Sequence, residues 1–193
     1  MPNWLVLIIG YLLGCIPTAY IAGRKKAGKD IRCLGDKNPG AGNAYRELGP
    51  TPGVIVFFVD TAKGVAAVLI AQAGQLSQNW VMATGLATVI GHNWPIFLGF
   101  RGGRGVATTL GILYVLAPVP MLVMTVPTFL ILLWRRNVTP AMAFLFIILP
   151  FVEWAFKTNP AIIVYGLFLP ALTGVLTFFR TRPKVQRGGL VGR

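Results

Sequence analysis

The sequence predicts an all-α polytopic membrane protein with seven transmembrane helices, some of them short or broken. Its composition, its long apolar runs and the placing of its basic residues lead to this prediction. Of the 193 residues, 55% are hydrophobic and only 12% are charged, whereas about 25% of a soluble domain is charged. The mean hydropathy is +0.68. No internal repeat divides the chain, so we expect one domain over residues 1–187 and a flexible tail over 188–193.

The first apolar run, residues 4–22, is a membrane span rather than a signal peptide. A signal peptide carries its basic residues before the apolar run, but here Arg24, Lys25 and Lys26 follow it. Six more apolar runs lie at residues 53–73, 80–98, 105–117, 121–134, 139–156 and 161–179. A full span takes about 20 helical residues. The third and fourth of these six runs are shorter, so they form either two spans or one long broken helix.

The basic residues favour two spans there. Lys and Arg concentrate on the cytoplasmic side of a membrane protein, and successive loops alternate between the two sides. With seven spans, all of the 18 Lys and Arg residues except Lys63 and Lys157 fall on one side. Six spans would place Arg135 and Arg136 opposite Arg101. We therefore predict an outside N-terminus and a cytoplasmic C-terminus, and the net charge of +13 reflects this topology rather than nucleic-acid binding.

Two of the predicted cytoplasmic loops are rich in glycine, which the positive-inside rule does not explain. The first, LGDKNPGAGNAYREL, covers residues 34–48, and its Asn38, Gly40, Asn43 and Arg46 are suited to surrounding a phosphate. The alternative is an ordinary turn-rich loop, since Asn, Pro and Gly also gather in turns for conformational reasons.

The second loop lies within GHNWPIFLGFRGGRGVATTLG, residues 91–111. Arg101, Gly102, Gly103 and Arg104 lead directly into the fourth span. A glycine-rich turn before a helix exposes N–H groups at the positive end of the helix dipole, and arginines add forked donors. The alternative is a basic cap that touches anionic lipid headgroups. Two such loops on one side together indicate a phosphorylated ligand at the membrane face.

Asp60 and Lys63 stand three residues apart in the second span, so they share a helix face and can form an ion pair. Ionisable residues inside a membrane often have a function, and the alternative is a buried pair that only fixes helix packing. The single histidine, His92, argues against a Ser-His-Asp triad, because no such arrangement is evident around it. Cys15 and Cys33 fit neither a metal-ligand spacing nor a disulfide framework, so both are interpreted as structurally neutral.

Three segments, KDIRCLGDKNPGAGNAYRELG, FFVDTAKG and GHNWPIFLGFRGGRGVAT, resemble the linked motifs of the bacterial acyl-phosphate-dependent glycerol-3-phosphate acyltransferases, the PlsY family. The similarity runs from about residue 10 to residue 111. The resemblance implies a seven-helix enzyme of the bacterial inner membrane with its site facing the cytoplasm. It implies acyl transfer from acyl phosphate to the 1-hydroxyl of glycerol 3-phosphate, which releases lysophosphatidic acid and phosphate. It implies no metal, no other cofactor and no acyl-CoA or acyl carrier protein donor.

The resemblance also implies roles for individual residues. Arg101 and Arg104 replace family lysines, and Arg104 is the candidate for stabilising the leaving phosphate. His92, in the GHxxP element, is a candidate general base, although a histidine at a helix end is more often a hydrogen-bonded structural residue. The expected phosphate-binding residues are Asp36, Lys37, Asn38, Gly40, Asn43, Arg46, Arg101, Gly102, Gly103, Arg104 and Arg180.

The chain departs from the family pattern where this site is expected. The family's GSGNxGATN is here GDKNPGAGN, so Asp36, Lys37 and Gly42 replace Ser, Gly and Thr. A carboxylate at Asp36 would repel a phosphate unless it is neutralised, and Lys37 is the predicted neutralising group. Thr181 stands where a family histidine is expected. The basic residues that could take over anion binding nearby are Arg180, Arg182 and Lys184. We therefore predict a divergent member, which acylates glycerol 3-phosphate or another phosphorylated alcohol.

Two other classes of protein are also compatible with these residues. A transporter for phosphate or an organophosphate also has broken spans and arginine-bearing glycine loops, but it usually binds at the membrane midplane and contains inverted repeats. Here the candidate groups lie at one face, and no repeat is seen. The third class is an inactive family member that binds anionic membrane lipid.

Overall fold

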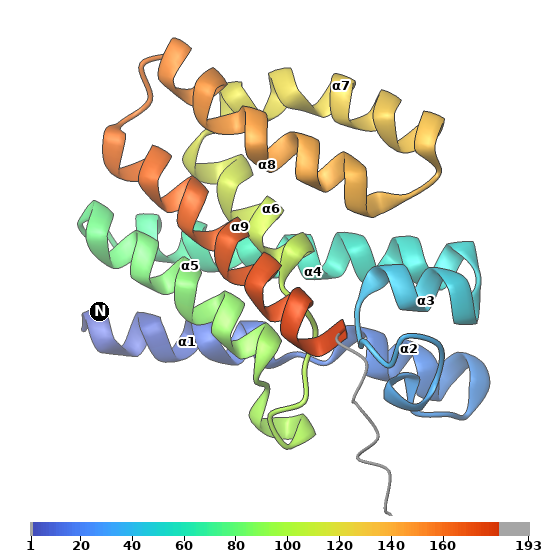
Figure 1. The fold of residues 1–193 in the computed structure, drawn as a ribbon. Helices are drawn as coiled ribbons and strands as arrows, with labels where there is room; N and C mark the ends of the chain where they lie inside the picture. The colour runs from blue at the N-terminus through green and yellow to red at the C-terminus, as the bar shows by residue number, and fades with distance from the viewer. Residues whose placement is uncertain (1, 182–193) are drawn as a thin grey trace, which may run out of the picture.

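The computed structural model describes residues 2–181, with side chains through residue 179 (Figure 1). Within this range every long element is a helix, as the composition predicts. The helices are α1 (Asn3–Cys15), α2 (Thr18–Ala27), α3 (Ala41–Leu48), α4 (Pro50–Ala73), α5 (Gln78–Asn93), α6 (Val106–Leu116), α7 (Pro118–Arg135), α8 (Val138–Ala155) and α9 (Pro160–Thr181), with short 3₁₀ turns η1 (Ile31–Cys33) and η2 (Ile96–Leu98). The tail predicted over 188–193 lies outside the described residues.

The helices are those of a multi-pass membrane protein. Within the described range, 6 segments are long and apolar enough to cross a membrane. They are Asn3–Ala27, Pro50–Ala73, Gln78–Leu98, Pro118–Arg135, Val138–Ala155 and Pro160–Phe179. The fourth predicted span corresponds to α6, which is apolar but has only 11 residues. Large apolar side chains such as Phe129 of α7 and Phe151 of α8 are exposed, as contact with lipid requires. The count of seven spans and the orientation of the termini stay predictions.

α6 and α7 are two helices rather than one broken helix. The chain leaves helical geometry at Ala117 (φ −134°, ψ 62°), directly before Pro118, and the residue before a proline disfavours the helical conformation. α6 packs mainly against α4, whereas α7 packs mainly against α8 at the edge of the bundle (Figure 1). The two short apolar runs therefore have different neighbours.

α3 is a helix where the sequence predicts one loop over residues 34–48. Ala44 and Leu48 are buried and belong to a small apolar cluster with Ile31 and Val56. Short helices are marginal by themselves and depend on packing of an apolar face. This cluster supplies that packing, which the glycines and asparagines of the segment do not reveal.

Two larger apolar clusters join the remaining helices. One lies between α1, α4, α5, α6 and α9, around Val68, Ile112 and Leu169. The other joins α6, α7 and α8 around Met121 and Leu149. Because α6 contributes to both clusters, this short helix connects the α7–α8 pair to the rest of the bundle.

Glycines let the central helices approach until their backbones touch. A Cβ atom at Gly14 of α1 would collide with the Thr88 carbonyl of α5, and one at Gly91 of α5 would collide with the Tyr11 carbonyl of α1. Small residues at such positions allow close contact between membrane helices. The contact fixes α1 against α5, whose last turn carries His92.

We expect Gly91→Ala to lower the free energy of unfolding by about 1–3 kcal/mol, because the added methyl group must push α1 away from α5. The matched control is Gly174→Ala on α9, where a Cβ atom meets nothing within 4 Å. Thermal unfolding of the detergent-solubilised protein measures both variants. Equal effects of the two substitutions would contradict the role assigned to the α1–α5 contact.

Candidate active site between the two glycine-rich loops

The two glycine-rich loops face each other across a cavity of about 520 Å³. The first loop and the turn before it contribute Asp30, Arg32, Cys33, Asp36, Lys37, Asn38 and Pro39, and the second contributes Phe100, Arg101, Gly102 and Arg104. Six of the predicted phosphate-binding residues are therefore brought together at one cavity. Four others, Gly40, Asn43, Arg46 and Gly103, lie outside its lining.

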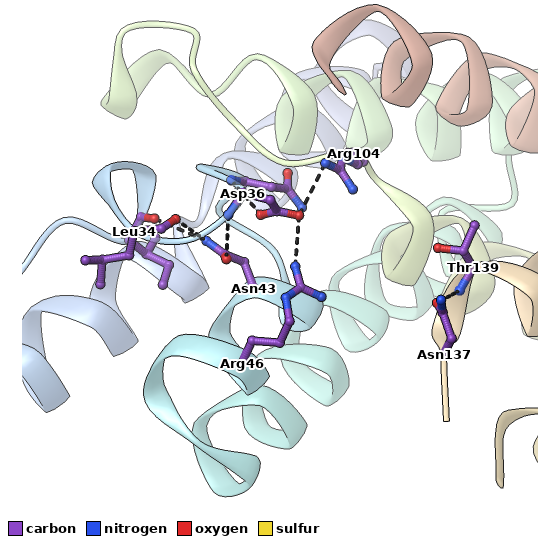
Figure 2. A network of polar contacts seen from close by, with 9 residues as sticks. Leu34, Asp36, Asn43, Arg46, Arg104, Asn137 and Thr139 are labelled. Atoms are coloured by element: carbon purple, nitrogen blue, oxygen red, sulfur yellow. Dashed lines mark hydrogen bonds and ion pairs between the residues drawn. The ribbon is translucent and has the colours of Figure 1, made fainter. Parts of the chain in front are cut away.

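Asp36 connects the two loops. Its Oδ2 atom lies 2.9 Å from Nη2 of Arg46 and 3.4 Å from Nη2 of Arg104 (Figure 2). Its Oδ1 atom accepts a hydrogen bond from the backbone N–H of Asn38 at 3.1 Å. The sequence predicts Lys37 as the neutralising group, but in the structure two arginines neutralise the carboxylate. Lys37 lines the cavity instead, with its backbone in the left-handed region (φ 60°).

Asn43 holds the backbone of the first loop through hydrogen bonds of its side chain. Its side chain is buried, and Nδ2 donates to the carbonyls of Ile31 at 3.3 Å and Leu34 at 3.0 Å. Its Oδ1 accepts from the N–H of Asp36 at 3.2 Å (Figure 2). Since these bonds use both N–H donors of the amide group, Asn43 supports the loop, and the predicted direct contact with phosphate has no support in this geometry.

Arg32 ties the first loop to the second. Its Nε and Nη2 atoms donate to the carboxylate of Asp30 at 2.7–3.1 Å, and Nη1 donates to the carbonyl of Leu98 in η2 at 2.9 Å. Hydrogen bonds from Arg32 hold the pKa of Asp30 below its usual value of 3.8. From the sequence, Arg32 is predicted only to be one of the basic residues that mark the cytoplasmic side of the membrane. The signal available in the sequence is the acidic and basic pair Asp30 and Arg32, separated by one residue within KDIRC.

Gly102 and Gly103 fit the second loop onto the end of α5. The N–H of Gly102 donates to the Asn93 carbonyl and the N–H of Gly103 to the His92 carbonyl, both at 3.1 Å. A Cβ atom at Gly103 would collide with the imidazole of His92. The sequence predicts these N–H groups as phosphate donors, but they bond within the protein. The glycines are required for the close approach of the loop to α5.

His92, Asp60 and Lys63 form a buried cluster next to the cavity. Nζ of Lys63 lies 2.6 Å from Oδ1 of Asp60, with each side chain 3% exposed, and this confirms the predicted ion pair. Nδ1 of His92 lies 3.9 Å from the same oxygen. A small cavity of about 10 Å³ lined by His92 and Asp60 shares Pro39 and Gly102 with the large one. The nearness of His92 to the ion pair is not evident from the sequence.

The break between α1 and α2 gives Lys63 a second partner. α1 ends at Cys15 and Pro17 precedes α2, so the carbonyl of Ile16 is not used in a regular helical bond. Nζ of Lys63 donates to this carbonyl. The ammonium group is therefore stabilised by a carboxylate and a carbonyl within apolar surroundings.

Three basic residues predicted to bind anions cannot be placed in the site. The side chain of Arg180, at the end of α9, lies outside the described part of the chain, and so do Arg182 and Lys184. Their role stays a prediction.

Comparisons with known proteins identify the class. The sequence matches the profile of the family described as glycerol-3-phosphate acyltransferase over residues 4–188. Glycerol-3-phosphate acyltransferase 4 of Dehalococcoides mccartyi is 44% identical over 178 residues, which are 92% of this chain and 96% of that protein. The glycerol-3-phosphate acyltransferase of Halalkalibacterium halodurans is 38% identical over 191 residues, which are 96% of this chain and 91% of that protein.

Two solved structures share the fold. PlsY (YgiH), described as an integral membrane glycerol 3-phosphate acyltransferase, matches in its glycerol 3-phosphate form with a TM-score of 0.81 and 32% identity, covering 94% of this chain and 95% of that chain. Its lysophosphatidic acid form matches with a TM-score of 0.75 and 33% identity, covering 94% and 89%. The protein described here is thus an integral membrane enzyme of the acyltransferase class.

The chain belongs to the glycerol-3-phosphate acyltransferase family. It acylates glycerol 3-phosphate, a step of phospholipid biosynthesis. This membership confirms the resemblance carried by the three sequence motifs and favours the enzyme over the transporter.

We expect Lys63→Met to lower the free energy of unfolding by about 3–5 kcal/mol, because it leaves the carboxylate of Asp60 buried without its close cation. The double variant Asp60→Asn/Lys63→Met removes both charges and should recover most of this loss. Thermal unfolding measures the variants, and the yield of monodisperse protein reports one that does not fold. A double variant no more stable than the single one would show that the ion pair is not the cause.

Proposed function

We propose that the acyl donor is acyl phosphate and that the acyl chain passes to the 1-hydroxyl group of glycerol 3-phosphate, releasing lysophosphatidic acid and inorganic phosphate. The observation that carries this proposal is the convergence of Arg32, Lys37, Arg101 and Arg104 on one cavity. Its volume of about 520 Å³ lies within the range of small-molecule sites. Because both proposed substrates carry phosphate, a basic cavity at the ends of apolar helices suits both.

The proposed reaction needs no covalent enzyme intermediate. The 1-hydroxyl oxygen attacks the acyl carbonyl carbon, an ester bond forms, and the bond from that carbon to the phosphate oxygen breaks. The hydroxyl proton ends on the released phosphate. Since acyl phosphate is already activated, the enzyme has to position the two substrates and stabilise the charge that develops on the leaving group.

Arg104 is the residue proposed to stabilise the leaving phosphate. Its side chain is 22% exposed, so its charge acts in a lower effective dielectric than that of a fully solvated arginine. Arg101, Lys37 and Asn38 line the same cavity and, together with Arg104, are proposed to bind the phosphate of glycerol 3-phosphate. The guanidinium group of Arg104 has five N–H donors, so it can contact both phosphates. Arginine suits such sites because its planar fork can donate to two phosphate oxygens at once.

His92 is proposed as the general base that takes the hydroxyl proton before it reaches phosphate. The nearest oxygen of the Asp60 carboxylate lies 3.9 Å from Nδ1 of His92. Gly102 lies between His92 and the large cavity, since it lines both cavities.

The site is proposed to face the cytoplasm across a bacterial inner membrane. The loops that form it carry basic residues that the positive-inside rule assigns to the cytoplasmic side. A second acceptor, another phosphorylated alcohol, is proposed because Asp36 stands in the lining in place of a family serine. Competition between glycerol 3-phosphate and other phosphorylated alcohols in the acylation assay tests it.

Purified protein incubated with acyl phosphate and glycerol 3-phosphate should release equal amounts of lysophosphatidic acid and phosphate, and acyl-CoA should not replace acyl phosphate. Arg104→Gln should lower kcat/KM by about 10²–10³-fold, the loss typical of one donor to a developing oxyanion. The matched control is Arg136→Asn, which removes an exposed basic charge at the end of α7, outside the lining of the cavity. This variant should change kcat/KM little.

Absence of both products from the wild-type reaction would overturn the proposed donor and acceptor. Equal losses in Arg104→Gln and Arg136→Asn would show that general surface charge, and not the cavity arginine, supports the reaction. Uptake of labelled phosphate by liposomes without any acylated product would favour a transporter.

We expect His92→Gln to lower kcat/KM by about 10²–10⁴-fold, because a general base contributes this much to proton transfer. The loss should appear in kcat, with KM for glycerol 3-phosphate little changed, because the base acts on the proton and not on binding. A purely structural histidine would give a different result: a lower unfolding temperature and a raised KM.

A further inference from the structure

The carboxylate of Asp36 occupies the donors that a phosphate would need. Its Oδ2 atom is shared by Nη2 of Arg46 from α3 and Nη2 of Arg104 from the loop before α6, at 2.9 and 3.4 Å (Figure 2). Its Oδ1 atom takes the N–H of Asn38 at 3.1 Å. A single side chain thus accepts from three residues, Asn38, Arg46 and Arg104.

Asp36 also stands between the cavity and Arg46. Asp36 and Arg104 line the cavity, whereas Arg46 does not. Arg46 is therefore connected to the cavity through the Asp36 carboxylate. A phosphate in the cavity reaches Nη2 of Arg46 by taking the place of that carboxylate.

These contacts are of the kind that a stronger anion can replace. Both arginines meet the same oxygen through one nitrogen each, not through the two-nitrogen fork that makes the strongest arginine–anion pairs. The Asp36 side chain is 32% exposed and that of Arg46 56%, so solvent weakens their attraction. Nε of Arg104 is buried and has no hydrogen-bond acceptor among the described residues. The guanidinium of Arg104 is thus only partly used by Asp36.

We propose that Asp36 is an internal anion that competes with the substrate phosphate for Arg46 and Arg104, and that the phosphate dianion binds by displacing it. This inference rests on the proposed function of the cavity. A carboxylate carries one negative charge and a phosphate monoester close to two near neutral pH, so the dianion makes the stronger pair with two arginines. Asp36 therefore lowers affinity for glycerol 3-phosphate and selects for dianionic phosphates over singly charged acceptors.

Asp36→Asn tests this competition. The amide keeps the oxygen that accepts from the N–H of Asn38 but removes the charge. KM for glycerol 3-phosphate should fall about ten-fold, and by more than any change in kcat, because a like charge next to the bound phosphate is removed. Asp36→Glu retains the charge and should not lower KM. Glu47→Gln removes an exposed carboxylate from the same helix as Arg46, outside the cavity lining, and should leave KM unchanged.

A rise in KM in Asp36→Asn would overturn the proposal, because it would show that Asp36 positions the arginines for the substrate. No change in KM, or the same fall in Glu47→Gln, would also overturn it. Binding of glycerol 3-phosphate and of inorganic phosphate, measured by calorimetry without acyl donor, separates this inference from the proposed function. Tighter binding to Asp36→Asn than to wild type supports the competition even where no acylation occurs, and equal or weaker binding contradicts it.

Discussion

The backbone contact between α1 and α5 is the constraint on which the other features depend. Glycines at Gly14 and Gly91 let these two helices touch, and the end of α5 is thereby held against the break that follows α1. α4 also packs on both helices, so Lys63 reaches the carbonyl of Ile16 while it pairs with Asp60. A charged lysine within apolar helices is tolerated only with such partners.

The candidate site follows from this arrangement because the second loop folds back on the end of α5. The N–H groups of Gly102 and Gly103 bind the last carbonyls of that helix, and this places Arg101 and Arg104 opposite the first loop. Two contacts then join the loops: Arg32 donates to the carbonyl of Leu98, and Asp36 accepts from Arg104. The basic cavity and the buried His92 cluster are consequently neighbours, although they come from different spans.

Several residues have roles that differ from those the sequence predicts, and the reason is the same for each. Asn43, Gly102 and Gly103 have the composition of a phosphate cradle, yet their hydrogen-bonding groups hold the loops in shape. Asp36 is neutralised by arginines that lie 10 and 68 residues away along the chain, not by its neighbour Lys37. Residue type and local spacing indicate that donors gather here, but they do not tell which donors stay available to a ligand.

The sequence by itself determined the membrane class, the helical character of each apolar run and the family, because hydropathy and motif spacing are local properties. It also determined that Asp60 and Lys63 pair, since residues three apart share a helix face. Only the tertiary structure decided that α3 is a helix, that Arg32 joins the two loops and that Asp36 lies between Arg46 and Arg104. These outcomes depend on which surfaces bury one another, and packing between distant segments is not encoded in any short stretch of chain.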